Sequence, residues 1–201
     1  MSVAPYSLPP HLPDLTDITR YCRSEDFEPF LQMISATVKS DHSRIAAWRC
    51  KKEQLVGAIE RTQGSPLKSI HEELNQIELE RFLLIPSVRE LHRSCTEYRD
   101  LLSHRVMDIV LTEMDADGMI RPPVSFALIS MGSDGREEQT LITDQDNLIV
   151  YGDGGGEEAD HYFKEFSTRL VDRLEEAGFK RCTGDIMPTN QTPFFNCQIR
   201  S

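Results

Sequence analysis

The first half of the chain has a hydrophobic pattern typical of helices. Apolar residues recur three and four positions apart over 26–38 and again over 45–59, which predicts two successive amphipathic helices. The Gly-Ser-Pro run at 64–66 interrupts the spacing. The helical spacing resumes over 70–77, which predicts a third helix. Over 88–109 apolar residues alternate three and four positions apart, which predicts a long fourth helix.

This helical region, taken as 26–115, follows a segment of different character. Four prolines fall within the first 14 residues, so 1–25 is interpreted as a flexible lead-in. The helices are expected to form a bundle that packs on itself or on a catalytic core. A dimerising coiled coil, which would need a longer unbroken heptad run, is the alternative through which the chain could form an oligomer.

The pattern changes to that of a sheet after 122–123. The continuous apolar run over 124–131 predicts a strand buried on both faces, and 146–151 predicts a second strand. After a glycine-rich loop, 162–177 predicts a helix capped by Gly178, and 179–187 a third strand. The fold class is therefore α+β, with a core domain over 116–201.

Composition and charge narrow the function classes. The chain is 39% hydrophobic and 27% charged, and no apolar run reaches the length of a membrane span or a signal peptide. The net charge of −11 disfavours nucleic acid as the main partner. Five scattered cysteines without a CxxC pair indicate neither a disulfide framework nor a zinc site, which fits the cytoplasm.

Candidate chemistry is concentrated in MGSDGREEQTLITDQDN, residues 131–147. Gly132 allows close backbone approach, and Ser133 offers a hydroxyl and an amide at the start of a short helix, which predicts a phosphate cradle. Asp144 and Asp146 are two positions apart, so in extended chain they point to the same face. They could share Mg²⁺ or Mn²⁺ that a bound triphosphate completes.

An Asp-x-Asp pair alone is more often a solvated strand end than a metal site. The combination of a Gly-Ser turn, a polar spacer of ten residues and Asp-x-Asp before an apolar strand resembles the signature of the DNA polymerase β-like nucleotidyltransferase superfamily. More specifically, GSDGREEQTLITDQDNLIVY resembles the motif of bacterial signal-transduction nucleotidyltransferases, which are related to the uridylyltransferase of nitrogen regulation. The resemblance covers roughly 89–190.

The resemblance implies a mixed sheet flanked by helices and roles for particular residues. Gly132 and Ser133 would hold the β- and γ-phosphates, while Asp144 and Asp146 would hold the metal. Arg136 is a candidate phosphate contact, with an ion pair to one of the two following glutamates as the alternative.

The superfamily often places a third carboxylate on a neighbouring strand. Asp185 is the candidate for this catalytic carboxylate, and a strand-ending turn after Gly184 is the alternative. Because the chain stops at Ser201, soon after the third predicted strand, the core is expected to be truncated at its C-terminus.

Three functions follow from these observations. The leading one is magnesium-dependent transfer of a nucleoside monophosphate from a nucleoside triphosphate to a hydroxyl acceptor on a signalling protein. The second is a catalytically weak nucleotide-binding regulatory module of the same fold. The third is a helical interaction protein in which the motif is a coincidence.

Overall fold

The computed structural model describes residues 24–62, 64, 66–119, 121–184 and 186–190. The elements follow one another as α1 (Ser24–Ile59), α2 (Pro66–Leu84), α3 (Val88–Ala116), β1 (Phe126–Ser130), α4 (Gly132–Gly135), β2 (Asn147–Tyr151) and α5 (Gly156–Glu176). This confirms the α+β class. The lead-in predicted over 1–25 falls outside the described residues except at its end, where α1 begins.

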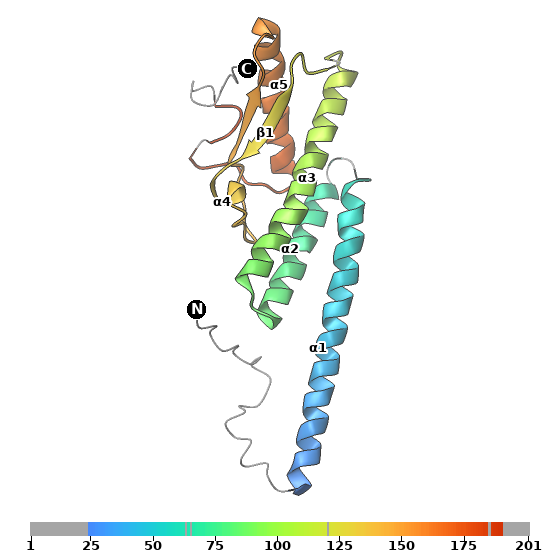
Figure 1. Cartoon of the computed structure of the whole chain (residues 1–201). Coiled ribbons are helices and arrows are strands. Elements are labelled where there is room, and N and C mark those ends of the chain that lie inside the picture. The colour runs from blue at the N-terminus through green and yellow to red at the C-terminus, as the bar shows by residue number, and fades with distance from the viewer. Residues whose placement is uncertain (1–23, 63, 65, 120, 185, 191–201) are drawn as a thin grey trace.

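The N-terminal pattern forms one helix where the sequence predicted two. Helix α1 runs without interruption through the polar stretch 39–44, because that stretch contains neither glycine nor proline to break it. Figure 1 shows the N-terminal half of α1 extending past the ends of α2 and α3. Leu31, Met33 and Val38 are accordingly exposed, and only the second half of α1 contributes a large apolar surface to the bundle.

Helices α2 and α3 confirm the third and fourth predicted helices. The apolar positions Ile70, Leu74 and Ile77 of α2 are buried, as the spacing required. Helix α3 starts at an N-cap, where the hydroxyl of Ser87 accepts a hydrogen bond from the amide of Glu90 at 3.4 Å. Among the described residues, none of the helices has the length and apolar character needed to cross a membrane.

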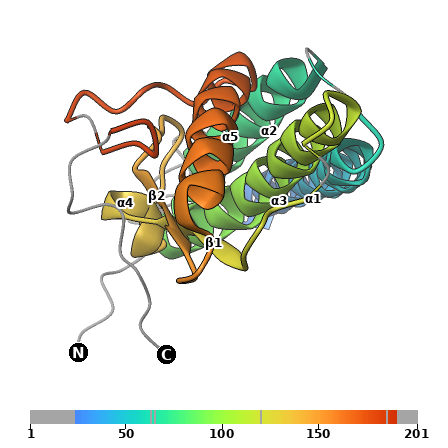
Figure 2. The ribbon, with the colours of Figure 1, turned by 90° about the horizontal axis from the view of Figure 1, so that it is seen from above.

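The strands β1 and β2 form an antiparallel ribbon that is packed on one face. The register pairs Phe126 with Tyr151 and Ser130 with Asn147. On the inner face Phe126 contacts the α5 ring of Phe163, at a centroid distance of 5.3 Å. Figure 2 shows the long helices α1, α2, α3 and α5 gathered on one side of the ribbon. The prediction that β1 is buried on both faces is therefore wrong, and Ile129 is 41% exposed.

The third predicted strand is not formed as a strand among the described residues. Over 179–187 the described residues form an isolated parallel bridge between Lys180 and Asp144 in place of a strand. The chain reaches this bridge by a sharp turn at the end of α5. Gly178 has a φ of 96°, and the amides of Gly178 and Phe179 donate to carbonyls in the last turn of the helix. The predicted Gly178 cap is confirmed.

Candidate functional site

The Asp-x-Asp segment is extended, and its side chains alternate between two environments. Thr143, Gln145 and Asn147 are buried on one side, whereas Asp144 and Asp146 are partly exposed on the other. The two aspartates therefore share one face, as their spacing predicted. Both residues are partly exposed, although Oδ1 of Asp146 is buried.

The residue between the two aspartates fixes the segment to the helical layer. Gln145 is 0% exposed, and its Nε2 donates to the carbonyl oxygens of Val171 at 3.1 Å and Phe179 at 3.2 Å. Both acceptors belong to α5 or the turn that follows it. A buried amide with two such bonds allows little rotation of the backbone, so it orients Asp144 and Asp146 outward.

Main-chain hydrogen bonds hold both sides of this segment. The amide of Met131 donates to the carbonyl of Asp146 at 2.7 Å, which ties the segment to the chain just before α4. On the other side the amide of Gln145 donates to the carbonyl of Lys180 at 2.8 Å, and that of Asn147 to Ile186 at 3.2 Å. The Asp-x-Asp segment is thus a short bridge between the Gly-Ser turn and the chain after α5.

Gly132 begins α4 in a conformation that other residues rarely adopt. Its φ is 58°, and a Cβ atom there would collide with Oδ2 of Asp146 and lie 3.2 Å from the carboxyl carbon. The backbone of the turn therefore lies directly against the Asp146 carboxylate. The first amides of a helical turn, here those of Gly132 and Ser133, have no acceptor within the turn. This is compatible with the predicted phosphate cradle.

Of the two remaining predicted residues, the structure describes Arg136 and not Asp185. The Arg136 guanidinium pairs with Glu138, with Nε 2.9 Å from Oε2, and both side chains are more than half exposed. The ion-pair alternative is thus present, but an exposed pair of this kind contributes little stability and a phosphate can replace it. Asp185 lies outside the described residues, so its role stays a prediction.

Two further carboxyl groups lie near the site. Burial raises the pKa of Asp134 in α4, and the neighbouring Asp146 carboxylate adds to this, against the opposing effects of Ser130 and Arg99. Burial likewise raises the pKa of Asp100, on α3, with Asp134 contributing. Four carboxyl groups are thus close together, and bound cations would offset their repulsion of a triphosphate.

The loop between α4 and the aspartates is attached to α3 by a buried cation. Arg99 is 1% exposed, and its guanidinium donates to Oε1 of the buried Gln139 at 3.2 Å and to Oδ1 of Asn75 at 3.0 Å. Through Arg99, helix α3 therefore holds this loop, and α3 also packs against α5.

Comparison with known families identifies this arrangement. A family model described as "Putative nucleotidyltransferase DUF294" matches residues 84–193. This is more than half of the 201 residues. The chain belongs to this family. Neither the curated proteins nor the solved structures contain a significant match.

Membership in this nucleotidyltransferase family accounts for the motif. The matched range includes α3, the Gly-Ser turn, both aspartates and the chain after α5. It agrees closely with the range of 89–190 over which the sequence resembles a nucleotidyltransferase. The alternative in which the motif is a coincidence is therefore excluded, and a nucleoside triphosphate is the substrate class that the family implies.

Nucleotidyltransferases use divalent metal ions, and the residues of this domain fit one. Asp144 and Asp146 supply the oxygen ligands that Mg²⁺ and Mn²⁺ prefer. Oδ1 of Asp146 is buried, and the donor beside this carboxylate is the weakly donating thiol of Cys182, so this oxygen has less compensation than a buried acceptor normally has. When bound, a divalent metal would neutralise phosphate charge and polarise the reacting groups.

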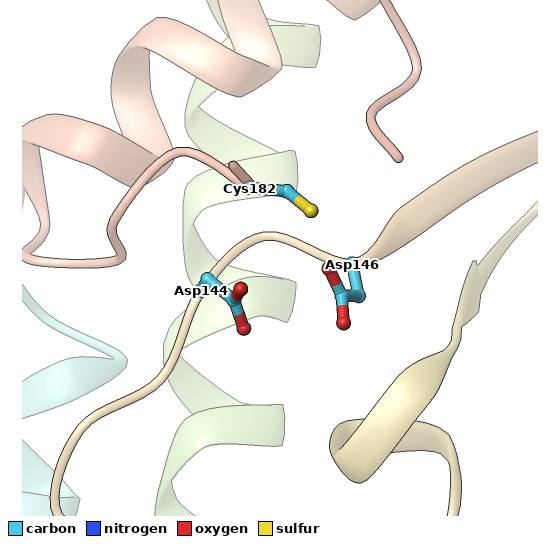
Figure 3. Close-up of side chains that lie close together, drawn as sticks. All are labelled: Asp144, Asp146 and Cys182. Atoms are coloured by element: carbon cyan, nitrogen blue, oxygen red, sulfur yellow. The ribbon is translucent and has the colours of Figure 1, made fainter. Parts of the chain in front are cut away.

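Sequence reasoning missed Cys182, whose sulfur lies beside both carboxylates. Figure 3 shows the Cys182, Asp144 and Asp146 side chains around a common space. One ligand atom from each lies within 4.8 Å of the other two. A lone cysteine without a CxxC partner carried no metal signal. The parallel bridge at Lys180, two residues earlier, and the bond from Asn147 to Ile186 bring it to the site.

Proposed function

We propose that this chain transfers a nucleoside monophosphate from a nucleoside triphosphate to a hydroxyl group, on a signalling protein as acceptor, with Mg²⁺ or Mn²⁺. One observation carries the proposal: the Gly-Ser turn lies against the carboxylate of Asp146, on the face that Asp146 shares with Asp144. A turn that can receive phosphates and a pair of metal ligands are thus adjacent. The resemblance to signal-transduction nucleotidyltransferases supports the choice of acceptor and a cytoplasmic location.

The residues have distinct proposed roles. Gly132 and Ser133 receive the β- and γ-phosphates, and Arg136 leaves its exposed pair with Glu138 to bind a phosphate oxygen. Asp144 and Asp146 hold the metal. The protein mainly positions the reactants, which accounts for the rigid attachment of this segment through Gln145.

The chemical step is an in-line displacement at the α-phosphorus. The acceptor oxygen forms a bond to phosphorus while the bond to the β-phosphate oxygen breaks, and pyrophosphate leaves with the bonding electrons. The acceptor proton passes to a carboxylate, for which Asp185 is the candidate. Replacing Asp185 by asparagine should then abolish transfer but change the affinity for metal and nucleotide less than about tenfold.

We also propose that the chain self-associates through its helical region. Leu31, Met33 and Val38 are exposed on the part of α1 that extends past α2 and α3 (Figure 1). A helix with exposed apolar side chains at this position offers a surface for a second chain.

A binding experiment tests the metal role of the aspartates. Nucleoside triphosphate should bind wild-type protein at least about tenfold more tightly with Mg²⁺ or Mn²⁺ than without, and Asp144→Asn/Asp146→Asn should lose this difference. Calorimetry with each of the common nucleoside triphosphates, with and without metal, measures both effects.

The matched control is Asp153→Asn/Glu157→Gln, which removes two exposed charges beyond β2 and should bind like wild type. Metal-dependent binding that survives in Asp144→Asn/Asp146→Asn contradicts the proposed metal site. Incubation of wild type with α-labelled nucleoside triphosphate in lysate then separates the two remaining functions, because a regulatory module binds the nucleotide and labels no protein.

A further inference from the structure

The donor set at the aspartates is mixed and includes sulfur. Cys182 Sγ belongs to the same group of ligand atoms as the carboxylate oxygens of Asp144 and Asp146, all within 4.8 Å of one another (Figure 3). Catalysis with Mg²⁺ needs only oxygen ligands, because Mg²⁺ is a hard cation. The sulfur therefore adds a property that the proposed transfer reaction does not require.

The position of Cys182 follows from the fold. The chain turns back after Gly178, forms main-chain bonds with 143–145 through Lys180, and then continues past the aspartates. The amide of Gly184 donates to Cys182 Sγ at 3.3 Å, so the sulfur is held by its own turn as well. Its neighbours in sequence thus fix Cys182 beside the carboxylates.

A second observation points to a cation at this place. Oδ1 of Asp146 is buried, and the donor beside its carboxylate is the thiol of Cys182, which donates only weakly. A buried carboxylate oxygen normally accepts a hydrogen bond or binds a metal. Gly132, which has no side chain, lies on the other oxygen of the same carboxylate.

The geometry points to Cys182 as a third metal ligand, which with Asp144 and Asp146 forms a site for a thiophilic divalent cation such as Zn²⁺. This inference rests on the proposed function, because the two aspartates are the same. Zn²⁺ accepts thiolate and carboxylate ligands in one tetrahedral site, with its fourth position open to water or substrate. On binding, the sulfur forms a bond to the metal and its proton is released to solvent.

The consequence is competition between two kinds of cation. Zn²⁺ held by one sulfur and two carboxylates should bind more tightly than Mg²⁺, which uses the carboxylates alone. Bound Zn²⁺ would then exclude Mg²⁺ from Asp144 and Asp146. Zinc is expected to act as an inhibitor of metal-dependent nucleotide binding.

The Cys182→Ser variant, studied without nucleotide, tests the third metal ligand. Zinc affinity measured by calorimetry should fall at least about tenfold relative to wild type, since even residues that only support a metal ligand contribute that much. Cobalt, used as a spectroscopic substitute, should give a thiolate-to-metal charge-transfer band with wild type and none with Cys182→Ser. The control is Cys50→Ser, which removes an exposed cysteine of α1 and should retain both signals.

Three results decide the inference. A charge-transfer band or zinc affinity that is unchanged in Cys182→Ser overturns it, and so does a band that survives in Asp144→Asn/Asp146→Asn. If wild type binds zinc through Cys182 but no nucleotide with magnesium, the proposed function fails and the zinc site stands.

Discussion

Gly132→Val should abolish metal-dependent nucleotide binding, with a loss of at least about 100-fold, or about 2.8 kcal/mol. Two effects act together. A φ of 58° costs a residue with a side chain about 1–2 kcal/mol, and the added Cβ would collide with Oδ2 of Asp146. The collision must move either the turn or the carboxylate, so the proposed phosphate and metal sites are both disturbed. Calorimetry with nucleoside triphosphate and Mg²⁺ measures the loss.

Gly118 offers a matched control for the backbone effect. It has a φ of 91°, but nothing lies within 4 Å of a Cβ placed there. Gly118→Val therefore carries a similar conformational cost without touching Asp146, and it should keep wild-type nucleotide affinity. A normally folded Gly132→Val protein that binds nucleotide as tightly as Gly118→Val would show that the turn does not hold phosphate.

Local pattern predicted most of the secondary structure. The buried stripes of α2, α3 and α5 follow directly from apolar residues at helical spacing, and β2 from an apolar run after the aspartates. The errors arose where the outcome depends on distant parts of the chain. The exposure of Ile129 reflects the absence of a layer on that side of the described ribbon, which no local pattern of β1 contains.

The site shows the same division between local and distant causes. The shared face of Asp144 and Asp146 follows from a separation of two residues in extended chain. The same rule could have placed Gln145 inside, because the residue between two outward aspartates must point inward. Cys182 and Asp134 could not be found in this way. They lie near Asp146 only because of the turn after α5 and the short helix α4.

One polar network connects the helical layer to the site. His71 on α2 lies between the end of α5 and Arg99, and Arg99 in turn holds Gln139 in the loop before the aspartates. The acceptors of Gln145 include the carbonyl of Phe179, whose ring lies 4.9 Å from that of His71. The orientation of the aspartates therefore depends on contacts made by His71.

The protonation state of His71 follows from its partners. The carbonyl oxygen of Ala177 can only accept, so Nδ1, 3.0 Å away, carries the proton. Nε2 is then unprotonated and accepts from Nε of Arg99 at 3.3 Å. The pKa of His71 is lowered from 6.5 to about 4, mainly by burial and also by the positive charge of Arg99, while the bond to Ala177 acts in the opposite direction.

The last prediction is a loss of stability in mild acid that depends on His71. Between about pH 6.5 and pH 4 the unfolded chain binds a proton at this histidine and the folded chain does not, so the free energy of unfolding falls as the pH falls. The whole difference corresponds to about 3 kcal/mol, of which about 2 kcal/mol is lost by about pH 5. Urea unfolding at about pH 7.5 and pH 5, followed by circular dichroism, measures it.

His71→Gln separates this effect from the carboxyl groups that titrate in the same range. The variant should be less stable than wild type near neutral pH, because glutamine cannot replace both bonds of the imidazole, but it should lose about 2 kcal/mol less on acidification. His161→Gln, at an exposed position of α5, should keep the wild-type pH dependence. An equal acid loss in wild type and His71→Gln would contradict the prediction.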